Sequence, residues 1–302
     1  MQVPAEFFSP GKLLLTGEYF VLHGAKALAV PTLQGQYLSV SPASKAHLLE
    51  WEFQDHLAQT LFKKKWNWSA IKLSFNEADQ DDYVLELLKA IHHRGLDLSG
   101  NKLVFRVDYP QAWGLGSSAA MLANMAKWTQ LNPLDLFFES QSGSGYDVAC
   151  SFEAHPILYQ LLEKGPAWEP IQFQPAFADR LWLVYFGQKQ SSAQEVKRFL
   201  KRNPPNTHSV NEMSRLSLSI ATENQLSKFQ ELLLQHEEKV GRAIGQTPVQ
   251  QRFFKDFQGV VKSLGAWGGD FMLAVSDSDA SPQAYFENKG FPQVFSWKQL
   301  VG

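Results

Sequence analysis

The chain alternates between short apolar runs and longer segments in which apolar residues recur at helical spacing. Residues 102–108 alternate apolar and polar positions as a half-buried strand does. Further strands are predicted at residues 13–15, 27–31, 48–53, 157–161, 167–173, 181–186 and 271–275, and helices at 78–94, 119–128, 191–202, 211–236 and 247–264. Because strands and helices mix without regular βαβ alternation, we expect an α+β fold. Strand-rich sequence gives way to helix-rich sequence between two expected domains, 1–178 and 179–302.

Residues 114–120, which read Gly-Leu-Gly-Ser-Ser-Ala-Ala, connect the strand at 102–108 with the helix at 119–128. Glycines let backbone approach a ligand closely, and the free N–H groups of a helix start favour an anion such as phosphate. Ser117 and Ser118 add hydroxyls that can cap the helix, bind phosphate oxygen or ligate Mg²⁺. Such a turn can also have a purely structural role, in which it caps the helix and lets the helix pack closely.

Two well-known phosphate motifs fit the chain poorly. The same letters satisfy Gly-x-Gly-x-x-Ala, but a dinucleotide site also needs a second strand that ends in an acidic residue about 20 positions later. Residues 132–135, Asn-Pro-Leu-Asp, stand there without a clear strand before them. The P-loop pattern, which requires Gly-Lys-Ser/Thr, is not found. A phosphate site here is therefore of another type.

Charge and cysteine content limit the partners that we expect. The 302 residues carry a net charge of −2, which gives no broad attraction to nucleic acid or to an anionic membrane. The one tight basic run, residues 63–65, is expected at a solvated edge or turn. No apolar run reaches 18 residues and residues 1–10 do not resemble a secretory signal. With a single cysteine, Cys150, expected to be packed, we predict a cytoplasmic protein that has no membrane segment.

Three further polar clusters accompany glycines. Lys12 begins an apolar strand, where an ammonium group is costly unless it snorkels to solvent or meets a ligand. Asp147 follows a Gly-Ser-Gly turn, so it can cap a helix or accept a proton from a substrate hydroxyl. Residues 265–270, Gly-Ala-Trp-Gly-Gly-Asp, lead into the strand at 271–275 and can be an ordinary turn.

Together these segments resemble the GHMP small-molecule kinases, which include galactokinase, homoserine kinase, mevalonate kinase and phosphomevalonate kinase. Residues 10–19 resemble the family's first motif, residues 114–120 its phosphate loop and residues 265–270 its third motif. The resemblance covers most of the chain through these anchors. It implies an N-terminal domain like the second domain of ribosomal protein S5 and a ferredoxin-like C-terminal domain.

The resemblance also implies cofactors and roles. ATP and Mg²⁺ would be used, and Lys12 and Asp147 would be catalytic. The phosphates of ATP would be bound by Gly114, Leu115, Gly116, Ser117, Ser118 and Ala119. Mg²⁺ would be held by Ser118 and, as the nearest match to the family's acidic ligand, Glu139. The acceptor would be contacted by Glu18, His23, Ser192, Gly268 and Gly269.

The sequence departs from the family pattern at two tryptophans. Trp267 stands where the third motif usually has glycine, and Trp113 precedes the phosphate loop. Either side chain could narrow the cleft in which ATP and acceptor would meet. A GHMP-like nucleotide-binding protein without kinase activity is therefore one alternative reading.

The acceptor is expected to be a small alcohol or phosphate compound. Residues 143–149 look more like phosphomevalonate kinases, whereas Val21 to Gly24 and residues 27–31 look more like mevalonate kinases. An alcohol needs a base such as Asp147, while a phosphate acceptor mainly needs cations, and few lie near the motifs. This favours mevalonate, with phosphomevalonate as the alternative and with homoserine and sugars still open as acceptors. Both a monomer and a homodimer fit the sequence.

Overall fold

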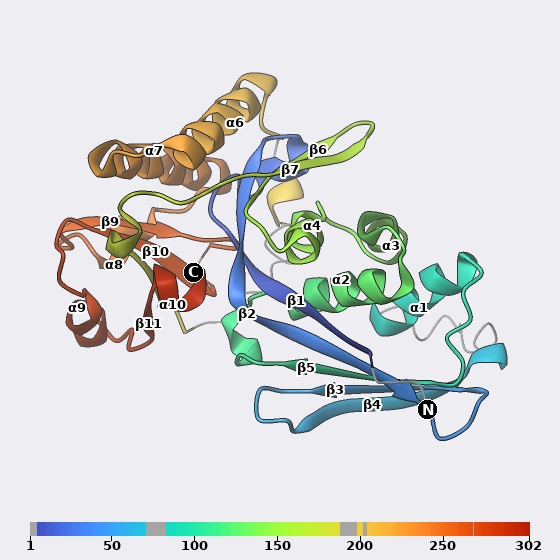
Figure 1. Ribbon diagram of the computed structural model, residues 1–302. Helices are drawn as coiled ribbons and strands as arrows, with labels where there is room; N and C mark the ends of the chain where they lie inside the picture. The colour runs from blue at the N-terminus through green and yellow to red at the C-terminus, as the bar shows by residue number, and fades with distance from the viewer. Residues whose placement is uncertain (1–4, 71–82, 188–197, 202–203, 268) are drawn as a thin grey trace. The chain divides into compact units, whose positions relative to one another are not determined.

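The computed structural model describes residues 5–70, 83–187, 198–201, 204–267 and 269–302, and it is a mixed α+β structure built on two sheets (Figure 1). The larger sheet contains β1 (Ala5–Leu14), β2 (Ala27–Pro42), β3 (Leu48–Gln54), β4 (Thr60–Asn67), β5 (Asn101–Val107), β6 (Ile157–Leu162) and β7 (Gly165–Pro170). The smaller sheet contains β8 (Leu181–Tyr185), β9 (Gly259–Ser263), β10 (Phe271–Ser276) and β11 (Val294–Ser296). The α+β fold expected from the sequence is confirmed.

The chain divides into two compact units that do not follow one another along the sequence. The first unit lies within Met1–Gly11, Gln34–Gln111 and Gly116–Ala154. The second lies within Lys12–Leu33, Ala112–Leu115 and His155–Gly302. The phosphate loop is thus shared, since its first residues group with the second unit and its last residues with the first. A domain boundary between 178 and 179 stays a prediction.

In the first unit, helices cover one face of the sheet formed by β3, β4, β5 and the later part of β2 (Figure 1). These helices are α1 (Tyr83–His93), α2 (Ser117–Thr129), α3 (Pro133–Ser140) and α4 (Tyr146–Glu153). β5 runs parallel to β3 and antiparallel to β2, with Phe105 opposite both Phe53 and Leu38. All three side chains are buried, as their alternation along each strand requires.

The basic run at residues 63–65 lies on β4, the edge strand of this sheet. Lys63 pairs with Glu52 at 3.4 Å and Lys65 with Glu50 at 2.8 Å, both across the β3–β4 ladder. Lysines on an edge strand discourage pairing with other chains. The expectation of a solvated edge is confirmed, and so is the burial of Cys150, which is fully enclosed.

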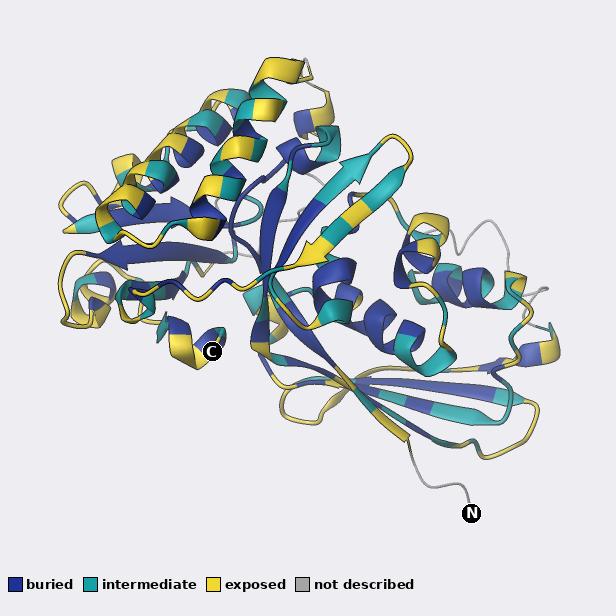
Figure 2. Cartoon of the chain, turned by 45° about the horizontal axis from the view of Figure 1, so that its top comes forward, coloured by how far each residue is buried: buried dark blue, intermediate teal, exposed yellow. Residues whose placement is uncertain are grey.

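In the second unit, the smaller sheet is antiparallel throughout in the order β11-β8-β10-β9. Helices α6 (Thr207–Thr222) and α7 (Leu226–Ile244) lie over one face, and Figure 2 shows their buried and exposed sides. On the other face, α8 (Val249–Phe253) and α9 (Gln283–Asn288) enclose an aromatic cluster around Phe254 and Phe286. The last helix, α10 (Trp297–Leu300), follows β11.

Two of the predicted helices were wrong in extent. Residues 247–264 form the short α8, which ends at Phe253, and then β9, which begins at Gly259; the β-branched Val260 and Val261 suit a strand. Residues 211–236 belong to two helices, α6 and α7, which are separated at Glu223 to Gln225. Most of the helix predicted at 191–202 lies outside the described residues.

Candidate active site

The glycine-rich turn delivers the chain into the N-terminus of α2, as the sequence predicted. Gly114 and Gly116 have φ values of 66° and 89°, a region that L side chains rarely adopt. Gly116 is the N-cap residue, and no described side chain caps the helix. The first turn, Ser-Ser-Ala, carries no carboxylate, so its N–H groups suit an anion such as phosphate.

Lys12 binds the first half of this turn through both its backbone and its side chain. In the second unit, its backbone N–H donates to the carbonyl of Leu115 at 2.8 Å. Its ammonium group donates to the carbonyl of Gly114 at 3.4 Å. Motif one is therefore fixed against the phosphate loop, and the positive charge lies at the backbone of the loop.

Asp270, the last residue of motif three, lies against the same turn. A Cβ atom added to Gly114 would be only 2.1–2.3 Å from the carboxylate atoms of Asp270. Nearby, the hydroxyl of Tyr185 at the end of β8 donates to the carbonyl of Ala112 at 2.8 Å. The second unit thus brings motif one, the start of the loop at residues 114–120 and the end of motif three together.

Gly114→Ala should lower the free energy of unfolding by about 2–3 kcal/mol, because it imposes a strained φ and also forces the carboxylate of Asp270 to move away. Gly290→Ala is a matched control in the same unit, since Gly290 has a φ of 89° and no atom within 4 Å of an added Cβ. It should show only the backbone cost, about 1–2 kcal/mol. Chemical denaturation of both variants measures the difference, and equal losses would contradict the close contact.

Trp267, the main departure from the family pattern, is a core residue of the second unit. It is 3% exposed and packs in one cluster with Tyr19, Phe20, Met213 and Val240. Its backbone N–H donates to the hydroxyl of Tyr19 at 3.3 Å. The indole thus fills the space between motif one and helices α6 and α7, which explains how a tryptophan is accommodated within a glycine motif.

Trp113 is also held within the second unit. Its ring makes edge contacts with Phe295 at 4.9 Å and Phe271 at 6.1 Å, and its indole N–H donates to the side chain of Gln293 at 3.1 Å. These contacts hold in place the residue that immediately precedes the loop at residues 114–120.

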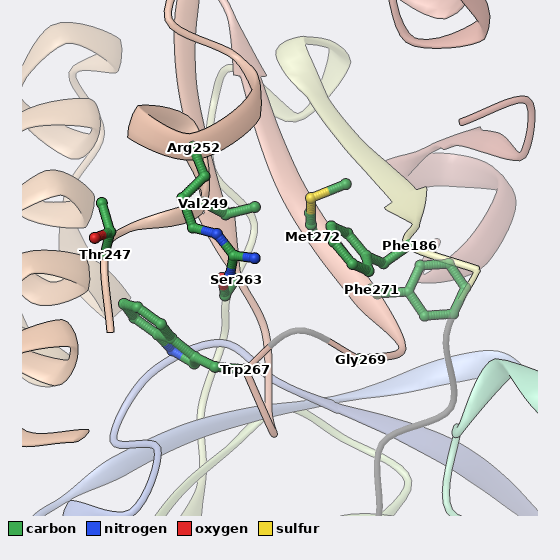
Figure 3. A pocket seen from close by; sticks show the side chains of 9 residues that line it. All are labelled: Phe186, Thr247, Val249, Arg252, Ser263, Trp267, Gly269, Phe271 and Met272. Carbon is green, nitrogen blue, oxygen red and sulfur yellow. The ribbon is translucent and has the colours of Figure 1, made fainter. Parts of the chain in front are cut away.

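A small hollow in the second unit lies beside motif three (Figure 3). The aromatic rings of Phe186, Trp267 and Phe271 line it, together with Gly269 of the motif. Arg252 from α8 reaches into it (Figure 3). One cation therefore lies next to a segment that was predicted to contact the acceptor.

Glu18 is engaged within the protein. It is 1% exposed; one carboxylate oxygen contacts the ammonium group of Lys262, and the other lies 3.3 Å from Nε2 of His236. The backbone N–H of Gly17 donates to Nε2 of His236 at 2.9 Å. Lys262 also donates to the carbonyl of Ser263 and lies 4.0 Å from Glu237. We call Glu18, His236, Glu237 and Lys262 the buried ionic cluster; it ties motif one to β9 and α7.

The buried ionic cluster should make stability depend on pH through Glu18. Desolvation, partly offset by Lys262, raises the pKa of Glu18 from 4.5 to about 7. Between pH 4.5 and 7, Glu18 holds a proton in the native state that it has lost in the unfolded chain. The contribution of this proton to the free energy of unfolding therefore falls as pH rises, and it levels off above about pH 7. One pKa unit corresponds to about 1.4 kcal/mol, so the fall is about 3 kcal/mol at most.

Glu18→Gln removes this titration. The difference in free energy of unfolding between the wild type and the variant, wild type minus variant, should therefore decrease as pH rises from 4.5 to 7. His236 is present in both proteins; burial and then Lys262 lower its pKa well below 6.5, so its effect cancels in the comparison. Urea titrations of both proteins at several pH values measure this difference. A difference that does not change with pH would contradict the raised pKa.

The other predicted acceptor residues differ in their surroundings. His23 lies at the end of a short 3-10 helix, Phe20–His23, with its ring on Phe199 at 5.6 Å, and burial lowers its pKa. Gly269 is described, whereas Ser192 and Gly268 lie outside the described residues. Contacts of Glu18, His23, Ser192, Gly268 and Gly269 with an acceptor stay predictions.

Asp147 stands in the first turn of α4 in the first unit, partly exposed. Gly145, at a φ of 80°, is the N-cap residue, and Oδ1 of Asp147 accepts the N–H of Val148 at 3.0 Å. The position suits a proton acceptor, and the catalytic role of Asp147 stays a prediction.

The acidic metal ligand is the weakest part of the predicted site. Both carboxylate oxygens of Glu139 are engaged, one by His93 at 2.8 Å and the other by Arg94. Desolvation raises the pKa of this carboxyl, but the two bonds outweigh it and hold the pKa below its usual value. Among the described residues, no three His, Cys, Asp or Glu side chains gather as they do in a metal site. Ser118 is exposed and could serve as a ligand, so Mg²⁺ fits only partly.

Sequence reasoning missed three residues that contact the site: Lys262, Asp270 and Tyr83, whose hydroxyl donates to the carbonyl of Ser118. The signal for Lys262 was a lysine within the apolar run Gly-Val-Val-Lys-Ser, which resembles the signal noted at Lys12. Asp270 was included in motif three but received no role. Nothing in the sequence pattern distinguishes Tyr83.

The chain resembles several solved kinases in structure. Methanococcus jannaschii mevalonate kinase has a TM-score of 0.69 at 17% identity, covering 98% of this chain and 97% of that chain. Streptococcus pneumoniae phosphomevalonate kinase in complex with phosphomevalonate and AMPPNP has a TM-score of 0.70 at 16% identity, covering 97% and 99%. Lactococcus lactis galactokinase complexed with galactose has a TM-score of 0.67 at 16% identity, covering 97% and 93%.

These likenesses extend over nearly the whole of each chain and confirm that this protein has the fold of the GHMP kinases. The similar structures act on several different acceptors, so the fold by itself does not select one. No protein-family model matches the chain, and no curated protein sequence matches it. None of the described helices is long and apolar enough to cross a membrane.

Proposed function

We propose that this chain is an ATP-dependent small-molecule kinase and that its acceptor is mevalonate. The observation that carries the proposal is the meeting of three motifs at the Gly114 turn in the second unit, where Lys12 bonds to the carbonyls of Gly114 and Leu115 and Asp270 lies against Gly114. A dehydrogenase would account for the glycine turn alone. Residues 132–135 do not form a strand; Asn132 caps α3, and this also speaks against a dinucleotide site.

In the proposed phosphoryl transfer, each of these residues has a separate role. Bound Mg²⁺–ATP supplies the phosphoryl group and the metal charge that stabilises its transfer. The N–H groups at the start of α2 would bind phosphate oxygens of ATP, and Ser118 would offer its hydroxyl to the metal. Lys12 neutralises negative charge next to the loop, and Asp147 accepts the proton of the acceptor hydroxyl.

Phosphomevalonate is the second candidate acceptor, and one observation favours it. Arg252 reaches into the hollow beside Gly269, where a cation would attract a phosphate group on the acceptor. Against it, Arg252 is exposed and its guanidinium lies over the ring of Phe253 at 4.7 Å. Because an alcohol must lose a proton and Asp147 can accept it, an alcohol acceptor remains the first candidate.

A coupled assay of ATP consumption with Mg²⁺ tests the proposal, with mevalonate and phosphomevalonate in parallel and homoserine and galactose as controls. Turnover with mevalonate alone is the expected result. Turnover with phosphomevalonate alone would keep the kinase and change the acceptor. Nucleotide binding without turnover on any of the four would favour the alternative of a binding protein that has lost catalysis.

A further inference from the structure

Tyr83, the first residue of α1, contacts the phosphate-loop helix of the first unit. Its hydroxyl donates to the backbone carbonyl of Ser118 at 2.8 Å, across 35 positions of sequence. Ser118 is the second residue of α2 and follows the glycine turn directly. A side chain from α1 therefore holds the turn of helix that carries the predicted metal ligand.

The same phenol lies within electrostatic reach of Asp147. The charge of Asp147 acts on this hydroxyl. Tyr83 thus lies beside the starts of both α2 and α4.

We propose that Tyr83 is a positioning residue, which holds the Ser118 turn of α2 in register with Asp147 at the start of α4. This inference rests on the proposed kinase function. Its physical basis is that phosphoryl transfer depends on alignment, and a displacement of about 1 Å can cost about 100-fold in rate. One hydrogen bond to a helix carbonyl is a direct way to restrict such a displacement.

Tyr83→Phe removes the hydroxyl and keeps the ring. Tyr109→Phe is the matched control, because Tyr109 is a buried tyrosine of the same unit whose hydroxyl has no hydrogen-bond partner among the described residues. With the best acceptor from the assay, Tyr83→Phe should lower kcat about tenfold and raise the Mg²⁺ concentration needed for half-maximal rate. The KM for the acceptor should stay within about twofold of the wild type, since Tyr83 does not act on the acceptor.

Calorimetry gives a second readout that does not need turnover. The affinity for a non-hydrolysable ATP analogue with Mg²⁺ should fall about fivefold in Tyr83→Phe and stay unchanged in Tyr109→Phe. Circular dichroism and thermal unfolding check that both variants keep the fold.

The outcomes separate this inference from the proposed function. A wild-type protein that binds nucleotide without turnover would overturn the kinase, and the calorimetric comparison would still test Tyr83. Equal behaviour of Tyr83→Phe and Tyr109→Phe in nucleotide affinity and Mg²⁺ dependence would overturn the positioning role. A rise in acceptor KM alone would do the same, because it would assign Tyr83 to the acceptor site.

Discussion

Lys262→Met is expected to lower the free energy of unfolding by about 3–5 kcal/mol at pH 8, the cost of removing one partner from a buried ion pair. The ammonium group of Lys262 is fully buried in contact with Glu18, and Glu237 lies 4.0 Å away. Methionine fills a similar volume, so the loss reflects charge more than packing. Without the cation, two buried carboxyl groups must either stay ionised without compensation or take up protons from solvent.

The pH dependence of this loss identifies its cause. Burial raises the pKa values of both Glu18 and Glu237, and removing Lys262 should raise them further. At pH 5 both acids can be neutral in the variant, so the loss should be smaller there than at pH 8. Urea denaturation at the two pH values measures it.

Lys63→Met is the matched control, because Lys63 pairs with Glu52 at 3.4 Å on the surface, where its side chain is 54% exposed. An exposed pair contributes about 1 kcal/mol or less, so this variant should unfold almost as the wild type does. In the double variant Lys262→Met/Glu18→Gln, part of the loss should be recovered. A loss for Lys262→Met no larger than that for Lys63→Met would contradict the role of the buried ionic cluster.

The turns and strands whose conformation depends on neighbouring residues could be predicted from the sequence. The turn at 114–120 needs backbone with positive φ, and only Gly114 and Gly116 supply it at low cost, so the sequence and the geometry agree there. The strand at 102–108 is revealed by its alternation because one of its faces is buried. The order of the three glycine clusters then sufficed to suggest the fold that the solved structures confirm.

Long-range pairing explains what the sequence did not reveal. Lys262 and Glu18 are 244 positions apart, and either residue alone reads as an ordinary charged residue in or near a strand. The sequence shows only that the indole of Trp267 could narrow a cleft; it does not reveal that the indole packs with Met213 and Val240 of two distant helices. Similarly, one apolar pattern covers α8 and β9 and by itself predicts a single helix. A strand forms in its second part because contacts of β9 with β10 and α7 decide the outcome, and the pattern alone does not.

Asp147→Asn is expected to lower kcat by about 100-fold or more, the contribution of a general base that accepts a proton in the rate-limiting transfer. Asparagine has the same shape, and its Oδ1 can still accept the N–H of Val148, the bond of 3.0 Å that fixes the side chain at the start of α4. The fold and the affinity for nucleotide should therefore survive, while the proton acceptor is lost. Steady-state kinetics with the best acceptor measures kcat, and calorimetry measures nucleotide affinity.

Asp135→Asn provides the matched control, since Asp135 stands in the first turn of α3 in the same unit and is exposed. Both substitutions remove one negative charge from a helix start, which costs at most about 1 kcal/mol of stability through the helix dipole. A fall in kcat for Asp147→Asn alone would then reflect chemistry at Asp147 and not a general loss of charge. Near-normal turnover in Asp147→Asn would remove the base from the mechanism, and with it the main reason to prefer an alcohol over a phosphate as the acceptor.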